Sequence, residues 1–404
     1  MCEAADVLST PTGPLIGIDA RAASEEGAGR GRLVRELLRA LAERPAGPDA
    51  PRFVLYARER WVEPLPEDRF RWRLIAANDP LWHLRAARMA SRECDVFLST
   101  NSYLTVLFLR IPSVTVVYDL ITFDPGMRPN RRSMLIERAT LGAAVRRTSA
   151  LVAISNATRD ALIARFPRAA AKTVVAPLGV AAILRDPPGA AAASGGEHGS
   201  SGAGRLPAQE AERLPPAGFV LAVGTLEPRK NLPRLVAAYS RLGEDLQARH
   251  PLAVAGRTGW ETGETFAALQ SLGDRCTRLG YVSDGQLAEL YRRCAVFCYP
   301  SLGEGFGLPV LEAMAAGAAV VTSSVSSLPE VGGDAVEYAD PHSTESIAEA
   351  LRRVLEDERL RASLRARARV RALEFSWERF ATTVLETLLR AATTAGGTPG
   401  RLTN

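Results

Sequence analysis

The segment Tyr299–Glu330, YPSLGEGFGLPVLEAMAAGAAVVTSSVSSLPE, decides how the rest of the chain is interpreted. It begins at the end of Val296–Tyr299, an apolar run typical of a buried strand, which Pro300 breaks into a glycine-rich loop. Pro309 then suits the first turn of a helix that Gly317 closes. A strand, a glycine loop and a helix N-terminus together predict a site for an anion or a polyol, because free helix amides point into it.

Two carboxylates mark this predicted site. Glu304 lies in the glycine loop and Glu312 lies about one turn into the helix, with seven residues between them. Gly303, Gly305 and Gly307 carry no side chain, so the loop backbone can approach a ligand closely. A glycine loop alone is weak support for a site, and the alternative is a surface loop with two solvated acids. A glutamate on each side makes a binding site the preferred interpretation.

The composition is that of a globular protein with two domains, since one core rarely serves a chain of 404 residues. Hydrophobic residues make up 47% of the chain and charged residues 24%. The net charge of +5 suits an anionic substrate or a membrane surface and gives little support for nucleic acid binding. The start of the sequence lacks a secretory pattern, and no apolar run reaches the length of a membrane span. Five scattered cysteines favour reduced thiols in the cytoplasm and no zinc site.

The N-terminal half alternates apolar strands with helical stretches, which predicts a parallel sheet covered on both faces. The predicted strands are Leu15–Asp19, Phe53–Ala57, Trp72–Ile75, Val96–Ser99, Val114–Tyr118, Leu151–Ile154 and Thr173–Ala176. After the first strand, the glycine-rich Gly27–Arg32 precedes a helix and can cradle a phosphate; a flexible surface turn explains these residues equally well. The fifth strand is apolar apart from Thr115 and ends at Tyr118 and Asp119, where ligands of such sheets gather.

Two further stretches have ambiguous or low-complexity composition. The basic residues between Arg128 and Arg147 are interleaved with apolar ones, which is compatible with a surface helix that contacts anionic lipid or a lipid-phosphate acceptor. The preferred interpretation is an ordinary amphipathic helix whose apolar side packs on the sheet. The residues from Ala181 to Gly218 contain few large apolar side chains and predict a linker with a disordered insertion.

The second domain is predicted to begin with a strand at Phe219–Val223, followed by GTLEPRKN at Gly224–Asn231. Arg229 and Lys230 then lie at a strand end, beside the N-terminus of a helix that Asn231 is expected to cap. Two cations there suit a diphosphate, for which Arg supplies a fork and Lys a point charge. Two solvated basic residues are the alternative. Later strands are predicted at Leu252–Ala255, Thr277–Leu279, Val296–Tyr299 and Ala319–Thr322.

Together these motifs resemble the retaining glycosyltransferases of family 4, whose E-x7-E signature is similar to the pair Glu304 and Glu312. The resemblance is strong from Phe219 to Trp377 and moderate from Leu15 to Val180. It implies an α/β protein of the GT-B fold, with two facing, Rossmann-like, doubly wound parallel-sheet domains and a C-terminal helix that crosses back to the first. The implied divisions are an acceptor-side domain at 1–181, a linker at 182–217, a nucleotide-sugar-binding domain at 218–375, and the crossing helix with a disordered tail at 376–404.

The resemblance also implies roles for the charged motif residues. Glu304 would lie near the donor sugar and Glu312 would hold the nucleotide ribose. Lys230 would carry most of the pyrophosphate binding, with help from Arg229. Catalysis would then be mainly electrostatic, because these cations stabilise the charge that develops on the leaving phosphate.

Many relatives have His-Asp where this chain has Tyr118 and Asp119, so the proton chemistry of a histidine is unavailable at this corner. The implied catalytic residues are Glu304, Lys230, Arg229, Asp119 and Tyr118. The implied nucleotide-sugar contacts, besides Glu312, are Gly27, Gly29, Gly224, Thr225, Gly256, Tyr281, Val282, Gly305, Phe306, Gly307 and Leu308.

The implied reaction is transfer of a hexose from a nucleotide diphosphate sugar to a hydroxyl of a glycan or lipid-linked acceptor, with retention at the anomeric carbon. The resemblance of the sequence GTLEPRKN at Gly224–Asn231 favours a mannosyltransferase-like branch of the family and GDP-mannose as donor. No cofactor and no metal are expected, since the sequence has no Asp-x-Asp motif. An epimerase or phosphorylase on the same fold, and a non-catalytic nucleotide-sugar-binding subunit, are the alternatives. The expected location is the cytoplasm, with peripheral contact at the inner face of the plasma membrane and no nucleic acid partner.

Overall fold

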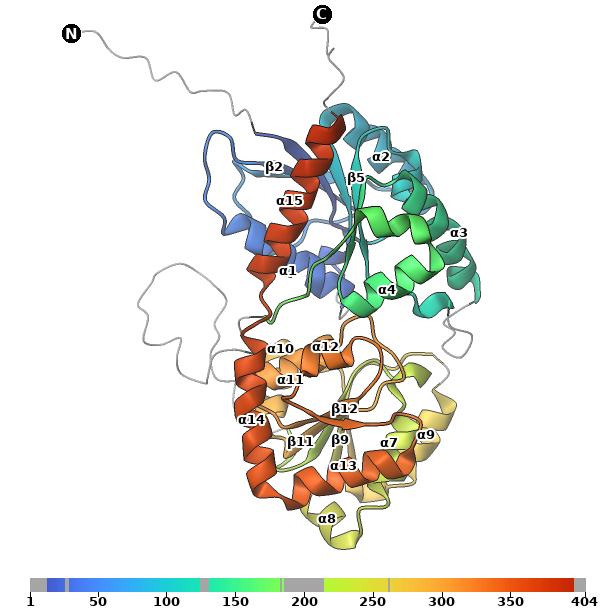
Figure 1. Cartoon of the computed structure of the whole chain (residues 1–404), viewed down its shortest axis with the longest axis vertical. Helices are drawn as coiled ribbons and strands as arrows, with labels where there is room; N and C mark the ends of the chain where they lie inside the picture. Colours follow the sequence, from blue (N-terminus) through green and yellow to red (C-terminus); the bar gives the residue numbers. More distant parts are fainter. Residues whose placement is uncertain are drawn as a thin grey trace, which may run out of the picture.

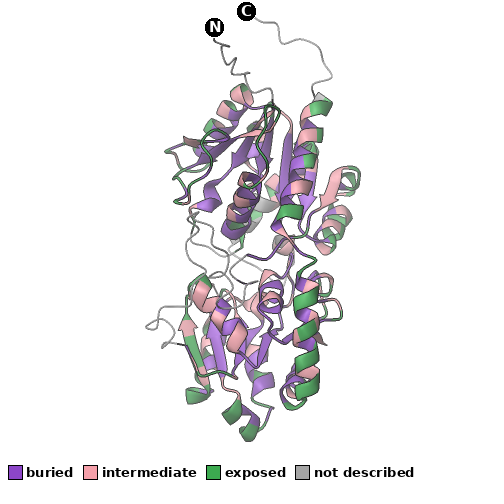
Figure 2. Cartoon of the chain, turned by 90° about the vertical axis from the view of Figure 1, so that its left-hand side faces the viewer, coloured by how far each residue is buried: buried purple, intermediate pink, exposed green. Residues whose placement is uncertain are grey.

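The computed structural model describes residues 13–25, 29–123, 131–181, 184, 214–260 and 262–395. They form two α/β domains stacked along the long axis of the molecule, each built around a parallel sheet with helices on both sides (Figure 1). The predicted fold class is therefore confirmed. The strands of both domains are mostly buried, whereas exposed residues gather on the outer helices (Figure 2).

The sheet of the first domain has seven parallel strands within the described residues, in the order β3-β2-β1-β4-β5-β6-β7. The strands are β1 (Leu15–Asp19), β2 (Arg52–Ala57), β3 (Phe70–Leu74), β4 (Val96–Ser99), β5 (Ser113–Val117), β6 (Ala150–Ala153) and β7 (Thr173–Val175). β4 and β5 are buried along their whole length, as expected of apolar strands covered on both faces. The strand order reverses between β1 and β4, and the carboxyl ends at such a reversal are where these folds bind ligands.

The sheet of the second domain has six parallel strands among the residues described, in the order β10-β9-β8-β11-β12-β13. The strands are β8 (Val220–Val223), β9 (Leu252–Ala255), β10 (Cys276–Gly280), β11 (Val296–Tyr299), β12 (Val320–Ser323) and β13 (Glu337–Ala339). β13 was not predicted, because three residues are too few to show a pattern. The order reverses between β8 and β11, which places the segments after these two strands side by side.

Helices cover both sheets. In the first domain they are α1 (Arg30–Ala42), α2 (Leu81–Glu93), α3 (Arg131–Arg147) and α4 (Asn156–Arg165), with 3-10 turns η1 (Arg21–Ala23), η2 (Thr105–Phe108), η3 (Ile121–Phe123) and η4 (Pro167–Lys172). In the second they are α7 (Leu232–Tyr239), α8 (Glu244–Arg249), α9 (Gly263–Gln270), α10 (Asp284–Arg293), α11 (Leu308–Ala315), α12 (Leu328–Gly332), α13 (Thr344–Glu356) and α14 (Glu358–Ala372), with turns η6 (Pro228–Lys230) and η7 (Gly273–Arg275).

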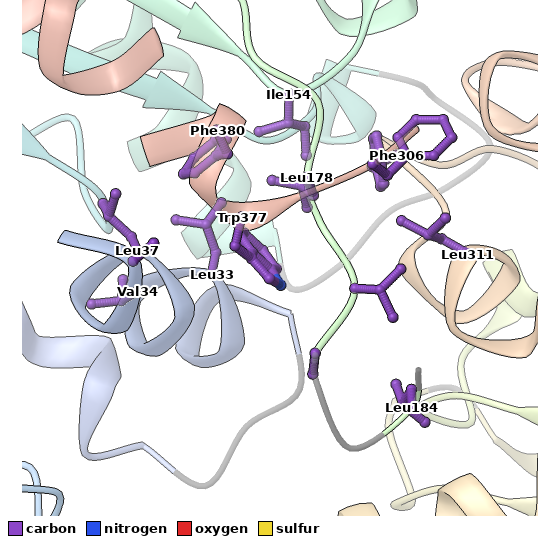
Figure 3. Packing of buried hydrophobic residues seen from close by; sticks show 14 of the residues in the cluster. Leu33, Val34, Leu37, Ile154, Leu178, Leu184, Phe306, Leu311, Trp377 and Phe380 are labelled. Carbon is purple, nitrogen blue, oxygen red and sulfur yellow. The ribbon is translucent and has the colours of Figure 1, made fainter. Parts of the chain in front are cut away.

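The last helix, α15 (Trp377–Ala395), leaves the second domain and packs on α1, β4 and β5 of the first (Figure 1). This is the crossing helix that the sequence predicts. One apolar core continues from the first domain through α15 into the second: Phe380 and Trp377 meet Leu33 of α1, and Phe306 and Leu311 lie across Leu178 (Figure 3). The two domains are therefore joined by buried side chains as well as by the chain itself.

Two local predictions are wrong, and each has a physical reason. Asn231 does not cap α7 with its side chain; it has a positive φ of 59° and its amide donates to the carbonyls of Pro300 and Pro341. The amide therefore ties three loops together instead. The glycine-rich stretch Gly27–Arg32 is not a loop throughout, because Arg30 to Arg32 form the first turn of α1. Most strand edges differ from prediction by one or two residues.

Some predictions fall on residues outside the described ranges. Gly27 is one of them, as are most residues of the predicted linker and the end of the chain after Ala395. The basic stretch that begins at Arg128 is described only from Arg131, where α3 starts.

Candidate active site

The glycine loop of the second domain contacts the first domain just after β5. A Cβ atom at Gly305 would lie 1.9 Å from the carbonyl oxygen of Tyr118, so no larger residue fits. The Gly305 carbonyl accepts hydrogen bonds from the hydroxyls of Ser155 and Thr158, at 2.6 and 3.0 Å. The loop backbone thus approaches the other domain at this glycine, and the candidate site lies at the junction of the two sheets.

Glu304 is the centre of a charged cluster in this loop. Its Oε1 accepts hydrogen bonds from Lys230 Nζ at 2.8 Å, and from the hydroxyls of Tyr299 and Ser301, each at 2.7 Å. Its Oε2 pairs with the guanidinium of Arg229. The Glu304 side chain is only 9% exposed. The structure therefore brings together three residues that the sequence predicted for one site: Glu304, Lys230 and Arg229.

The charges of this cluster determine its protonation. Burial alone would raise the pKa of Glu304, but Lys230 and Arg229 outweigh it and lower the pKa to about 2. Burial also lowers the pKa of Lys230, against the opposing effect of Glu304. Glu227 pairs with Arg229 as well, so two cations meet two carboxylates. A diphosphate that binds these cations would have to replace or share their carboxylate partners.

The backbone of the second domain holds the two cations in place. η6 follows β8 directly, and the Arg229 carbonyl accepts hydrogen bonds from the Leu302 amide and the Ser301 hydroxyl of the glycine loop, at 2.9 and 3.0 Å. A Cβ at Gly224 would lie 3.1 Å from Lys230 Cε, so this glycine makes room for the lysine side chain. The cations are thus fixed relative to Glu304 by contacts within one domain.

Glu312, unlike Glu304, is paired with a residue of the other domain. It is 4% exposed on α11, and its Oε1 accepts a hydrogen bond from Arg32 of α1, in the other domain. The second terminal nitrogen of Arg32 pairs with Asp284 at the start of α10, and the Tyr291 hydroxyl donates to Glu312 Oε2 at 3.4 Å. Burial raises the pKa of Glu312, against the opposing effect of Arg32. The carboxylate predicted to hold the ribose is held here by an arginine.

Arg32 is the main site residue that the sequence analysis missed. It lies in the glycine-rich stretch that was interpreted as a backbone phosphate loop, so its side chain received no role. A useful signal was available: Arg32 lies in the first turn of the helix, directly before the apolar face that begins at Leu33.

Tyr118 and Asp119 lie on the first-domain side of the junction. The Tyr118 hydroxyl donates to the Thr100 carbonyl at 2.6 Å, and the Arg30 guanidinium lies 5.3 Å from the centre of the Tyr118 ring. This hydroxyl is therefore directed into its own domain. Burial raises the pKa of Asp119, against the opposing effects of its hydrogen bond from the Ile121 amide and of Arg229 across the junction.

The residues predicted to contact the nucleotide sugar differ in how far they are exposed. Thr225 is exposed, and Tyr281 is 62% exposed with the Arg257 guanidinium 4.3 Å from its ring centre. Val282 is half-buried. A Cβ at Gly256 would lie 1.9 Å from the carbonyl oxygen of Gly224, so the ends of β8 and β9 can meet only through glycine.

Two other predicted contacts have structural roles. Phe306 is 4% exposed and packs edge-on against Phe375 at 5.9 Å, so its side chain belongs to the core between the domains. Gly307 has a positive φ of 101° and precedes Leu308, the first residue of α11. Gly29 has a positive φ of 84° and takes the same position before α1.

A cavity of about 340 Å³ opens in the first domain beside Tyr118. Most of its lining side chains can form hydrogen bonds: Arg21, Arg30, Asp79, His83, Ser99, Asn101, Ser102, Tyr103, Thr115, Val116, Tyr118 and Thr140. The charge of Arg21 is balanced by Asp19, with Nη2 and Oδ2 2.8 Å apart, and burial lowers the pKa of His83. The sequence analysis did not predict this cavity, because its residues come from many separate segments.

Among the described residues there is neither a cluster suited to a metal ion nor a helix suited to a membrane. No group of three or more His, Cys, Asp or Glu side chains is placed to hold a metal ion in these parts of the chain. None of the described helices is both long and apolar enough to cross a membrane.

Comparison with known families gives two matches, one for each domain. Residues 209–371 match the model described as "Glycosyl transferases group 1". Residues 28–182 match the model described as "Glycosyltransferase Family 4". The two matches together cover the whole second sheet and the first sheet except β1, and they include Arg32, Lys230, Glu304 and Glu312.

Similar proteins of known name include several mannosyltransferases. The O-antigen chain mannosyltransferase B of Escherichia coli is 34% identical over 316 residues, 76% of each chain. The serotype-specific mannosyltransferase WbdA of the same species is 38% identical over 179 residues, 43% of this chain and 22% of that longer protein. Among solved structures, sucrose-phosphate synthase from Thermosynechococcus elongatus has a TM-score of 0.71 at 20% identity, covering 95% of this chain and all of that one. HepE from Anabaena, solved with UDP and glucose, has a TM-score of 0.70 at 17% identity, covering 93% of this chain and 100% of that one.

Proposed function

Because the chain belongs to the family 4 glycosyltransferases and is an enzyme of the GT-B fold, we propose that it transfers mannose from GDP-mannose to a glycan hydroxyl, with retention at the anomeric carbon. The mannosyl donor is supported by the names of its Escherichia coli relatives, one of which aligns over 76% of this chain. The Gly224–Asn231 sequence, with its two cations, supports the same branch.

The observation that carries this proposal is the half-buried cluster of Lys230, Arg229 and Glu304. A glycosyl transfer from a nucleotide sugar releases a diphosphate, and preorganised cations stabilise the charge that develops on it. Lys230 and Arg229 supply this charge at the carboxyl end of β8, close to the N-terminus of α11. Because Glu304 pairs with both, it keeps the cations in position and lies where it can also contact the donor sugar.

The cavity beside Tyr118 supports a glycan acceptor. Tyr118 and Asp119 lie against the glycine loop, so the cavity adjoins the place where the sugar would be transferred. With Arg21 balanced by Asp19, the lining offers mainly hydroxyl and amide groups, which suit the hydroxyls of a neutral sugar. We propose that the terminal sugar of the acceptor binds here.

A lipid carrier on the acceptor is a second part of the proposal. It would bring a cytoplasmic enzyme to the inner face of the plasma membrane, and the basic helix α3 with exposed Arg146 and Arg147 would contact anionic headgroups. Sedimentation with vesicles containing an anionic lipid, compared with neutral vesicles at the same salt concentration, tests this contact.

The epimerase, phosphorylase and non-catalytic alternatives are not favoured, since the relatives are named as transferases. The proposed function is tested by incubating the protein with GDP-mannose, UDP-glucose and other nucleotide sugars, each with a mannose-terminated oligosaccharide. We expect a longer glycan with a newly formed α-linkage, seen by mass spectrometry and NMR, and release of GDP. An epimerised nucleotide sugar, a sugar phosphate or no turnover with any donor would overturn the proposal.

A further inference from the structure

Arg32 bridges the two domains through two carboxylates. Its guanidinium bonds to Glu312 of α11 through one terminal nitrogen and to Asp284 of α10 through the other. Arg32 and Glu312 are nearly inaccessible, 8% and 4% exposed, whereas the Asp284 side chain is 59% exposed. The mechanism proposed above uses Lys230, Arg229 and Glu304 and gives no role to Arg32, although this arginine holds the carboxylate that the family resemblance implies for the ribose.

The helix that carries Arg32 is firmly anchored. Leu33 and Leu37 of α1 belong to the core that Trp377 and Phe380 of α15 complete (Figure 3). α1 and α15 are in contact along the first domain. The backbone at Arg32 is thus fixed to that domain, and only its long side chain reaches the second.

The position of Arg32 conflicts with a ribose at Glu312. A carboxylate that binds two ribose hydroxyls needs both of its oxygens, and here Oε1 is bonded to Arg32 while Oε2 receives only the long hydrogen bond from Tyr291. Because Arg32 and Glu312 are both buried and bonded to each other, a ribose hydroxyl cannot take the place of the guanidinium at Oε1 while this bond is made. A ribose can therefore reach Glu312 only after Arg32 has moved.

We propose that Arg32 competes with the nucleotide for Glu312 and so sets the affinity of the enzyme for its donor. On nucleotide binding the guanidinium leaves Glu312 and stays on Asp284, whose exposed position lets the pair persist in solvent. Only molecules in which Arg32 has left Glu312 can then bind the nucleotide. The apparent dissociation constant for the nucleotide equals the intrinsic constant divided by the fraction of such molecules. Nucleotide binding also breaks one contact between the domains, and by linkage, domain docking weakens nucleotide binding equally. This inference rests on the proposed function and on the role at the nucleotide ribose that the family resemblance implies for Glu312.

The test is calorimetric titration of the full-length protein with GDP. Arg32→Met keeps an unbranched, flexible side chain but removes the guanidinium and its charge, and we expect about tenfold tighter binding. Arg32→Lys keeps the charge but cannot bridge both carboxylates, so its affinity should lie between those of Arg32→Met and the wild type. Arg35→Met is the matched control: it removes one charge from the same helix, but its guanidinium bonds to the carbonyls of Ala23 and Glu25 and not to Glu312.

Two further variants locate the effect. In the Glu312→Gln background, Arg32→Met should no longer tighten GDP binding, because the contested carboxylate is gone. Asp284→Asn should leave GDP binding nearly unchanged, because Arg32 contacts Asp284 both before and after it leaves Glu312. Thermal unfolding of each variant shows whether the fold is intact; if Arg32→Met does not fold, Arg32→Lys carries the test.

The outcomes separate this inference from the proposed function. Equal or weaker GDP binding by a folded Arg32→Met, with Glu312→Gln still weakening it, overturns the competition alone. Unchanged binding by Glu312→Gln overturns both the ribose assignment and the competition. No binding of GDP or any other nucleotide to the wild type or to Arg32→Met overturns the proposed function itself.

Discussion

Glu304 and Glu312 are two carboxylates on one segment, and their surroundings shift their pKa values in opposite directions. Glu304 is paired with Lys230 and Arg229 of its own domain, and its pKa is lowered to about 2. Glu312 is paired with Arg32 of the other domain, and its pKa is raised because burial outweighs that single cation. Two nearby cations offset the cost of burying a charge and one does not. Glutamates of the same motif can thus differ in protonation and in their dependence on domain contact.

The largest expected effect is on turnover, from Glu304→Gln. The neutral amide no longer offsets the repulsion between the charges of Lys230 and Arg229, so these side chains lose their positions. Because they stabilise the leaving diphosphate mainly in the transition state, their displacement lowers the maximal rate. We expect kcat to fall roughly 100- to 1,000-fold, with the affinity for free GDP nearly unchanged. Initial rates at saturating donor, paired with GDP titration, measure both quantities. Glu227→Gln, which removes a carboxylate that contacts Arg229 only, is the control and should lose much less.

The second effect concerns Glu312→Gln and falls on binding. Losing a charged hydrogen bond to the ribose should weaken donor and GDP binding by about 1–3 kcal/mol, roughly 5- to 150-fold in Kd. The maximal rate at saturating donor should change little. If instead Glu304→Gln abolished GDP binding while Glu312→Gln preserved it, the two assignments would be reversed.

A third prediction compares the stability of the two glutamate variants across pH. The pKa of Glu304 is lower in the folded protein, so its contribution to stability is present above about pH 4.5 and is lost as pH falls toward about 2. The pKa of Glu312 is raised, so its ionisation costs stability as pH rises above about 4.5. Chemical denaturation at several pH values should therefore show opposite slopes for the stability difference between wild type and each Gln variant. If the stability difference changed with pH in the same direction for both variants, the opposite pKa shifts of Glu304 and Glu312 would be contradicted.

The smallest expected effect is that of metal removal. Since Lys230 and Arg229 lie where a diphosphate would leave, we expect activity after exhaustive chelation to stay within about twofold of that with added magnesium. Rates measured in both conditions, with a magnesium-dependent enzyme as a control for chelation, check this. Strict dependence on magnesium would show that the two cations do not serve the leaving group by themselves.

Much of the fold could be predicted from short stretches of sequence. Buried parallel strands such as Val96–Ser99 and Val296–Tyr299 are continuous apolar runs, and their limits match the structure to the residue. The capping box of Ser283 and Gln286 at the start of α10 is equally local, because it depends on residues three apart. β13 and the role of Asn231 could not be predicted, since the first is too short for a pattern and the second is set by carbonyls of distant loops.

The sequence by itself determined the two-domain α/β fold, the family, and the grouping of Glu304 with Lys230 and Arg229. The fold follows from local patterns of apolar runs and glycines, whereas the family and the grouping of these three charged residues follow from the resemblance of their motifs to family 4. Only the tertiary structure decided that Arg32 holds Glu312, that Gly305 contacts Tyr118, and that a polar cavity opens beside Tyr118. These contacts join residues far apart in the chain; Arg32 and Glu312 are 280 positions apart. Which side chains meet across a domain junction depends on how two packed bodies dock, and no local pattern carries that information.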